Sequence, residues 1–147
     1  MPTGRHEGEF RFHPQFRPEF AQFPLEVRRI FDETVLAIKM AGGPAVGRPH
    51  VDTLKGSRHA NMKELRFDAE DGVWRFAFAY DPSRNATVLC GGGKQGVNQK
   101  LFYKRLIATA DERYDTHLAV LLAAKAKAGA ESKVKVAQPG YGKGGGK

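Results

Sequence analysis

Cysteine is nearly absent from this sequence, since Cys90 is the only one among 147 residues. A chain with one cysteine forms no internal disulfide and no cysteine-based metal cluster. The five histidines also lack the i, i+4 or HExxH spacing of a zinc site, so neither a metal nor another cofactor is expected. We expect Cys90 to lie in a buried strand, where a free thiol packs as a small apolar group.

Long apolar runs are missing as well. The longest, from Leu118 to Ala124, is far shorter than the roughly 20 residues that span a bilayer. Residues 1–7 lack the apolar core of a secretory signal. The chain is therefore expected to be a soluble, cytoplasmic protein without a membrane partner.

Acidic residues are few relative to basic ones. The chain has 24 Lys and Arg against 16 Asp and Glu, a net charge of +8 and a pI near 9.8. Residues 125–147 hold six lysines and one glutamate, which accounts for +5 and leaves +3 for residues 1–124. A basic protein of this size favours a polyanionic partner. Because residues 1–124 are only mildly basic, a nucleic-acid interpretation depends on where their charges lie.

A strong hairpin signal is present at residues 63–80. Two runs of alternating apolar and polar residues flank Asp71-Gly72, and glycine supplies the positive φ of a tight turn. The alternation predicts a register in which the facing pairs are Asp68 and Val73, Phe67 and Trp74, Arg66 and Arg75, Leu65 and Phe76, and Glu64 and Ala77.

This register separates the side chains of the hairpin onto two faces. The apolar face predicts a core and carries Leu65, Phe67, Trp74, Phe76, Phe78 and Tyr80. The other face carries Glu64, Arg66, Arg75, Ala77 and Ala79. Like charges opposite each other in a sheet are unfavourable, so two facing arginines indicate either a bound anion or two solvated side chains screened by Glu64. The two small alanines are expected to leave room for a ligand.

A third strand is expected at residues 86–90, after a turn at residues 81–85. The expected pairs are Tyr80 with Ala86, Phe78 with Val88 and Phe76 with Cys90. Gly91-Gly92-Gly93 is interpreted as the exit of this strand, because the motif lacks the spacing and the Ser or Thr of a Walker A phosphate loop.

The N-terminal part is expected to form a short strand at residues 9–13 and then helices. Phenylalanines at helical spacing predict a short first helix, and Pro24 fits the start of a longer one that ends near Ala41. The inward side of the longer helix is expected to carry Val27, Ile30, Phe31, Thr34, Ile38 and Ala41. Residues 45–61 show no periodicity, which predicts a long loop.

A last helix is expected to begin after the N-cap Asn98 and to end near Ala126. Residues 9–126 then form one α+β domain, residues 1–8 are expected to be disordered, and residues 127–147 form a flexible tail rich in lysine and glycine. We expect a small, twisted, mainly antiparallel sheet with the N-terminal and C-terminal helices on one face and a basic, partly open second face.

Two loops are expected to extend the basic face. One carries Asp52 and Lys55 and enters the hairpin, and the other carries Lys94 and leaves the third strand. Both are expected to reach the same end of the sheet. Together with the two arginines they form a cluster that suits the phosphate backbone of a nucleic acid.

Five segments together resemble a known family. They are Gly47–Gly56, Lys63–Phe67, Val73–Tyr80, Gln99–Ile107 and Ala110–Leu118. In their order and spacing they resemble the RelE/ParE superfamily of type II toxin–antitoxin modules, in its HigB-like, phage Gp49-like branch. The resemblance runs from about residue 9 to 122 and implies a RelE-like sheet with a basic face that acts on RNA.

For activity, the resemblance implies cleavage of messenger RNA in the ribosomal A site without a metal ion. The 2′-OH attacks the adjacent phosphate, which requires a base, a cation beside the phosphorane and an acid for the leaving 5′-oxygen. By resemblance, Arg75 is the phosphate clamp, Asp52 is the candidate base, and Arg66 and Lys94 complete the catalytic set. The expected RNA contacts are Lys55, Arg58, Lys63, Lys100, Tyr103 and Lys104. Glu64 departs from the family, because RelE has a lysine at that strand position.

The resemblance also implies two partners, namely mRNA on the ribosome and a cognate antitoxin with a helix-turn-helix domain. Two alternatives remain open on the sequence alone. One is a ParE-like inhibitor of DNA gyrase, because one fold serves both activities in this superfamily. The other is a non-catalytic, basic RNA-binding module of phage origin.

Overall fold

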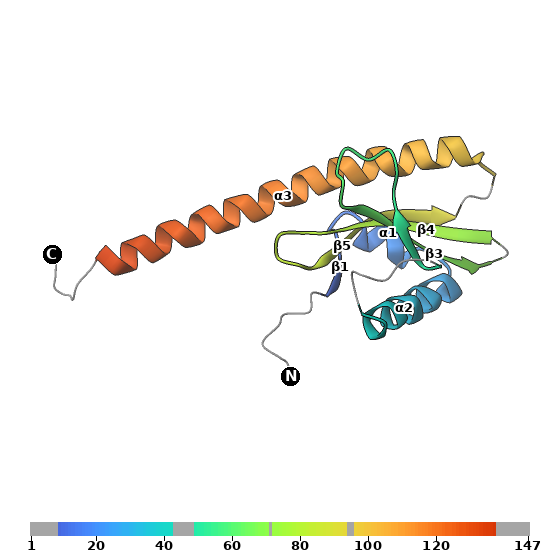
Figure 1. Ribbon diagram of the computed structural model, residues 1–147, viewed down its shortest axis with the longest axis horizontal. Coiled ribbons are helices and arrows are strands. Elements are labelled where there is room, and N and C mark those ends of the chain that lie inside the picture. Colours follow the sequence, from blue (N-terminus) through green and yellow to red (C-terminus); the bar gives the residue numbers. More distant parts are fainter. Residues whose placement is uncertain (1–8, 43–48, 71, 94–95, 138–147) are drawn as a thin grey trace. The chain divides into compact units, whose positions relative to one another are not determined.

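A computed structural model describes residues 9–42, 49–70, 72–93 and 96–137, of which residues 132–137 are described by their backbone alone (Figure 1). The elements, in chain order, are β1 (Phe10–Phe12), α1 (Arg17–Ala21), α2 (Leu25–Met40), β2 (Val51–Thr53), β3 (Met62–Ala69), β4 (Gly72–Tyr80), β5 (Ala86–Gly93) and α3 (Gln99–Ala137). Residues 1–8, expected to be disordered, lie outside the described residues.

The strands form one five-stranded sheet in the order β1-β5-β4-β3-β2. β1 is parallel to β5, and the other neighbouring strands are antiparallel. The predicted α+β fold with a mainly antiparallel sheet is confirmed. The predicted irregular loop of residues 45–61 is wrong in part, because Val51–Thr53 pairs with β3 as an edge strand. Three residues are too few to show the alternation that identifies a strand.

The hairpin of β3 and β4 has the predicted register. All five predicted pairs are present, including Arg66 opposite Arg75. The turn into β5 also has the predicted pairing of Tyr80 with Ala86. The Asp81 carboxylate holds this turn by accepting hydrogen bonds from the backbone N–H groups of Ser83 and Asn85, at 2.8 and 3.1 Å.

The predicted pairing of Cys90 with Phe76 is wrong. A β-bulge at Ala77/Phe78 shifts the register, so that Cys90 pairs with Ala77 and Gly91 pairs with Phe76. One extra residue in a strand reverses the face of every residue after it. Cys90 therefore lies on the face opposite to Phe76, where its Sγ is 3.4 Å from the carbonyl oxygen of Leu106. Burial raises the pKa of the Cys90 thiol to about 12.

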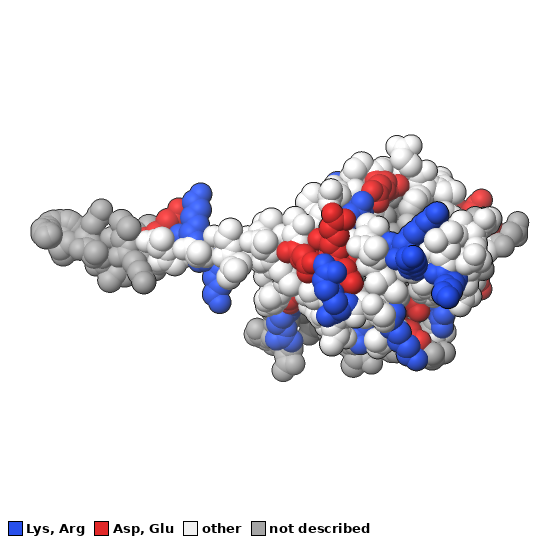
Figure 2. Space-filling view, turned by 90° about the horizontal axis from the view of Figure 1, so that it is seen from above, with Lys and Arg blue, Asp and Glu red and all other residues white. Residues whose placement is uncertain are grey.

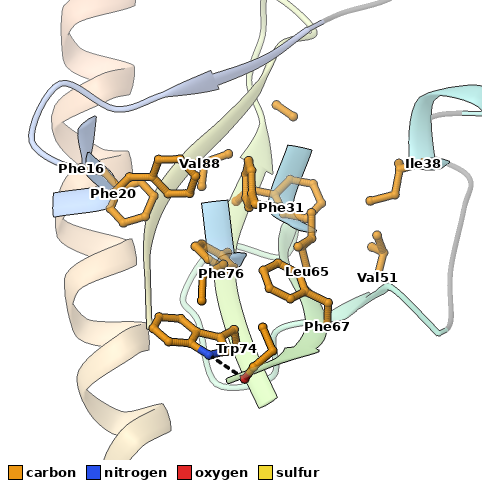
Figure 3. Packing of buried hydrophobic residues seen from close by; sticks show 14 residues of the cluster. Phe16, Phe20, Phe31, Ile38, Val51, Leu65, Phe67, Trp74, Phe76 and Val88 are labelled. Carbon is orange, nitrogen blue, oxygen red and sulfur yellow. Dashed lines mark hydrogen bonds between the residues drawn. The ribbon is translucent and has the colours of Figure 1, made fainter. Parts of the chain in front are cut away.

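The main core lies between the sheet and the helices α1 and α2 (Figure 3). Phe76 is at its centre, with its ring centroid 4.8 Å from that of Phe31 and 5.5 Å from that of Phe67. Such contacts bury large apolar areas, each aromatic side chain contributing several kcal/mol at roughly 25 cal/mol per Å². Trp74 satisfies its one polar group by donating from Nε1 to the carbonyl oxygen of Ala69 at 3.1 Å (Figure 3).

Most residues predicted for the inward side of helix α2 do face this core. Its buried residues are Val27, Phe31, Thr34 and Ile38. Pro24 is the N-cap rather than the first helical residue, and Ala41 is exposed, in contrast to the prediction. The helix ends at Met40 because Gly42 adopts a positive φ of 122°, which stops the helical path.

The first part of α3 packs on the opposite face of the sheet, so the prediction that all helices share one face is wrong (Figure 1). Leu106, Ala110 and Tyr114 are its buried apolar and aromatic residues there, and Asp111 is buried as well. Small residues on that face of the sheet, such as Ala77 and Ala79, allow a helix to approach closely. The predicted N-cap is confirmed, because Asn98 Oδ1 accepts a hydrogen bond from Leu101 N at 2.8 Å.

The chain divides into two units, Met1–Tyr114 and Asp115–Lys147. The second unit contains the rest of α3, which continues past the predicted end at Ala126 to Ala137. The predicted flexible tail is therefore helical at residues 127–137, while residues 138–147 lie outside the described part. Alanine and lysine are strong helix formers, which accounts for the extension. Among the described residues, none of the helices combines the length and the apolar character that a bilayer crossing requires.

Candidate nucleic-acid interface

The candidate site consists of two adjacent rows of residues that cross the sheet beneath the first part of α3. In one row, Arg66 on β3, Arg75 on β4 and Gly92 on β5 are paired neighbours. In the next row, Asp52 on β2, Glu64 on β3, Ala77 and Cys90 are paired neighbours. Neighbouring residues in one row are about 5 Å apart at Cβ. The fold therefore places two arginines directly beside two carboxylates.

Arg75 is the most unusual residue of this cluster. Its side chain is buried at 7% exposure, and α3 covers it with two aromatic rings. The guanidinium carbon is 5.8 Å from the ring centroid of Phe102 and 5.4 Å from that of Tyr103. Nε and Nη1 of Arg75 have no hydrogen-bond partner among the described residues. An unpaired buried donor is costly, and a charged one more so, so burial of these two N–H groups disfavours the structure as it stands.

Glu64 is the other buried charged residue of the cluster, at 6% exposure. It accepts a hydrogen bond from the hydroxyl of Tyr103 at 2.8 Å. Burial raises the pKa of Tyr103, and the bond to Glu64 adds to the rise, while the positive charge of Arg75 opposes it. Tyr103 is therefore protonated at neutral pH, as its role as a donor to Glu64 requires.

The predicted space beside the arginines is absent. Ala77 and Ala79 are both fully buried. Arg66, by contrast, is half-buried, and Asp52 has the same intermediate exposure. The basic face is thus covered over β4 and remains partly open over β3 and β2.

Asp52 lies on the short edge strand β2. Its carboxylate accepts a hydrogen bond from the backbone N–H of the next residue, Thr53, at 2.8 Å. Arg66 is fixed through its backbone, because its N–H donates to the carbonyl oxygen of His50 at 2.9 Å. Both residues thus lie on ordered strands of the sheet. Asp52 is in the same row as Glu64, and Arg66 is in the same row as Arg75.

Lys55 and Arg58 lie on the loop between β2 and β3, and both are exposed. This loop is held by the buried Asp111 of α3, whose carboxylate accepts hydrogen bonds from Ser57 Oγ at 2.5 Å and Arg58 N at 3.2 Å. The side chain of Arg58 also approaches Asp111 at 3.9 Å. The loop joins β3 at Met62, about 13 Å along the strand from Arg66.

The prediction that two basic loops meet at one end of the sheet is wrong. β3 and β5 both run antiparallel to β4, so the start of β3 and the end of β5 lie at opposite ends. β5 ends with Gly93 beside Trp74, whereas the loop of Lys55 lies beyond Met62 and Ala79. Lys94 itself lies outside the described residues.

The three lysines also predicted to contact RNA, Lys63, Lys100 and Lys104, do not lie on the same part of the structure. Lys63 alternates with Glu64 and therefore lies on the α2 side of the sheet, away from Arg75, where its Nζ is 3.5 Å from Thr53 Oγ1. Lys100 and Lys104 are exposed on the first turns of α3. Lysine and arginine side chains gather at the end of the molecular face where α3 begins (Figure 2).

The sequence interpretation missed Glu64 and Phe102 as members of the site. In the sequence Glu64 indicates only a screening partner, although the predicted register places it one row from the arginines. The helical spacing of Phe102 does not show which group its ring contacts, and in the structure that group is Arg75. The packing of α3 on this face of the sheet, which places Phe102 beside Arg75, has no local signal in the sequence.

Among the described residues, no group of three or more His, Cys, Asp or Glu side chains is arranged to hold a metal ion. Fold and site together define a small α+β protein whose antiparallel sheet carries a charged cluster beneath a helix. A family model described as "Phage derived protein Gp49-like" matches residues 18–115. The chain belongs to this Gp49-like family, as predicted.

Two curated relatives come from Mycobacterium tuberculosis (strain ATCC 25618 / H37Rv). They are candidate toxins named HigB2, 47% identical over 78 residues, and HigB3, 47% identical over 77 residues. Each match covers 52% of this chain, and 38% and 65% of the respective relative. The matched part thus spans less than two thirds of either relative.

A solved structure also has this fold. It is a variant of the E. coli toxin RelE in the free state, with a TM-score of 0.52 and 11% sequence identity over 74% of this chain and 98% of that one. At this identity the similarity concerns the fold alone. It confirms the predicted RelE-like sheet.

Proposed function

We propose that this chain is the toxin of a type II toxin–antitoxin pair and that it cleaves mRNA on the ribosome without a metal ion. Membership of the Gp49-like family and the two HigB-named relatives support the toxin role. The observation that carries the proposal is the buried guanidinium of Arg75, with Nε and Nη1 unpaired, beside Arg66 and two carboxylates.

In the proposed reaction, the 2′-oxygen of one nucleotide attacks the adjacent phosphorus, and the bond from phosphorus to the 5′-oxygen of the next nucleotide breaks. The products are a 2′,3′-cyclic phosphate and a free 5′-hydroxyl. Arg75 stabilises the phosphorane, because its planar fork matches two phosphate oxygens. Arg66 adds a second positive charge from the facing strand. Lys94 is proposed as a further cation of the same site.

Asp52 is the proposed base that takes the 2′-proton. It is half-buried on the edge strand next to Glu64, so it is more accessible than that residue. The exposed cations Lys55, Arg58, Lys100 and Lys104 are proposed to bind flanking phosphates. Such contacts orient the RNA and add salt-dependent affinity without reading sequence.

The test is induction of this chain in bacteria, with growth and mRNA integrity followed together. Wild type is expected to arrest growth and to shorten translated messages. Arg75→Gln should reduce cleavage by at least about 100-fold, the usual effect of losing one transition-state donor. Arg29→Gln is the matched control, because Arg29 is exposed on α2 and pairs there with the exposed Glu33 at 2.9 Å.

Two results would contradict the proposal. Unchanged toxicity of a folded Arg75→Gln variant would exclude Arg75 as the clamp. Growth arrest with intact mRNA and accumulating broken DNA would instead indicate gyrase inhibition. The proposed partner is a small helix-turn-helix antitoxin encoded beside this chain, and its co-expression is expected to restore growth.

A further inference from the structure

Arg75 is covered by its own protein in this structure. Phe102 and Tyr103 lie against the guanidinium, and the neighbouring Ala77 and Ala79 are fully buried. A phosphate group cannot reach Nε and Nη1 of Arg75 while these rings remain in place. The residues that form the proposed clamp are therefore assembled but closed.

The closed arrangement contains opposing contributions. The rings gain apolar contacts and a cation–π interaction with Arg75. Against this, two buried N–H groups of a charged side chain remain unpaired. A ligand that accepts hydrogen bonds from these N–H groups supplies the partners that they lack in the closed form. Opposing terms of this kind allow a ligand to shift the equilibrium toward an open form.

The hydroxyl of Tyr103 holds the cover in place through side-chain interactions with Glu64 and with Arg75 itself. This hydroxyl donates to the buried carboxylate of Glu64 at 2.8 Å, and Glu64 lies diagonally across the β3–β4 ladder from Arg75. Hydrogen bonds to a charged acceptor are stronger than neutral ones. The bond therefore fixes the ring over Arg75 and keeps a negative charge beside the place that a phosphate would occupy.

We propose that Glu64 is a positioning residue that holds the Tyr103 ring across Arg75, so that the free protein has a closed phosphate site and bound RNA replaces this contact. The proposal rests on the proposed function in one respect, namely that Arg75 binds an RNA phosphate. It changes the role of Tyr103 from the predicted RNA contact to a cover that opposes RNA binding.

The test measures the affinity of a fluorescein-labelled single-stranded RNA oligonucleotide for the full chain by fluorescence anisotropy. Tyr103→Phe removes the hydroxyl, which donates to Glu64 and also interacts with Arg75, and it keeps the ring. We expect RNA to bind about threefold to tenfold more tightly, the range that loss of one ordinary hydrogen bond supports. The double variant Arg75→Gln/Tyr103→Phe should lose this gain.

Tyr114→Phe is the matched control. Tyr114 lies on the same helix and its hydroxyl is also bonded, to Tyr80 O at 3.2 Å and to Asn61 Nδ2 at 3.1 Å. The same chemical change there should leave RNA affinity unchanged. Glu64→Gln is a second variant, expected to bind more tightly than wild type because it also removes the neighbouring negative charge.

Amide hydrogen exchange provides an independent measurement. Tyr103→Phe should increase exchange at residues 99–106, and Tyr114→Phe should not. The proposal is overturned if Tyr103→Phe binds RNA no more tightly than Tyr114→Phe. If Tyr103→Phe binds RNA more tightly in an Arg75-dependent way but the protein cleaves no mRNA, the closed phosphate site is supported. The proposed nuclease function is then contradicted.

Discussion

Gly91 shows how one residue fixes the local path of the sheet. Because of the bulge at Ala77/Phe78, Gly91 lies opposite Phe76 on the core side. A Cβ atom at Gly91 would be 2.3 Å from Cδ2 of the Phe76 ring, which is far inside van der Waals contact. Phe76 is fully buried, with the rings of Phe31 and Phe67 packed against it. The position therefore requires glycine for reasons of space.

We predict that Gly91→Ala lowers the free energy of unfolding by about 1–3 kcal/mol, as overpacking of a dense core does. Gly92→Ala is the matched control. A Cβ there would lie 3.9 Å from Phe102 Cε1, an ordinary contact, so its effect should be below about 1 kcal/mol. Urea unfolding of both variants measures the difference. Equal effects of the two substitutions would contradict this account.

Among the elements, the hairpin of β3 and β4 was the most predictable. Asp71-Gly72 and the alternation of two long strands specify one register, because a slip by one residue would place Leu65 and Phe67 on the wrong face. The register in turn placed Arg66 opposite Arg75, which is the core of the candidate site. Both results came from local periodicity alone.

The elements that were not predicted lack such local signals. Gly91 to Gly93 have no side chains to show alternation, so the bulge in β5 is invisible in the sequence. β2 has three residues and depends on pairing with β3. The burial of Arg75 depends on α3, whose contact residues Phe102 and Tyr103 are distant in sequence. Tertiary packing decides all three features.

Helix α3 has a second role, as an anchor for the loop between β2 and β3. Its buried Asp111 accepts hydrogen bonds from Ser57 and Arg58. Gly56, with φ of 100°, brings the loop close to Ile107, one helical turn before Asp111. The loop with Lys55 and Arg58 is therefore ordered by the helix that covers Arg75.

We predict that Asp111→Ala destabilises the fold by about 2 kcal/mol or more, because it removes the shared acceptor of two loop donors. Asp32→Ala is the control, since Asp32 is exposed on α2. Thermal or urea unfolding measures both. Protease cleavage should also increase within residues 54–61 of the Asp111 variant. A variant as stable as the control would show that the loop is held by other contacts.

At the scale of the whole molecule, burial and charge are divided between the two units. Among the side chains of α3 that the structure describes, the buried ones all lie at or before Tyr114, and those from residue 122 to 131 are exposed. Residues 125–147 nevertheless carry +5 of the net charge of +8. The first unit therefore supplies the buried contacts that stabilise the fold, and residues 125–147 supply most of the charge that attracts a polyanion.

We predict that a chain ending at Ala124 unfolds within about 2 °C of the full chain, because it loses no described buried side chain. Its affinity for RNA should depend less steeply on salt, since fewer lysines contact phosphates. Thermal unfolding and RNA titrations at several salt concentrations measure the two effects. A large loss of thermal stability would assign a structural role to residues 125–147.

The bulge between β4 and β5 also affects how this chain should be aligned with other proteins. A relative whose strands pair regularly has one residue fewer in β5, so a correct alignment needs a one-residue gap near Leu89. Without the gap, Cys90 and Gly91 would each be matched to a residue of the opposite face. Substitution patterns in that column would then mix positions that pack against Phe76 with positions that pack against α3.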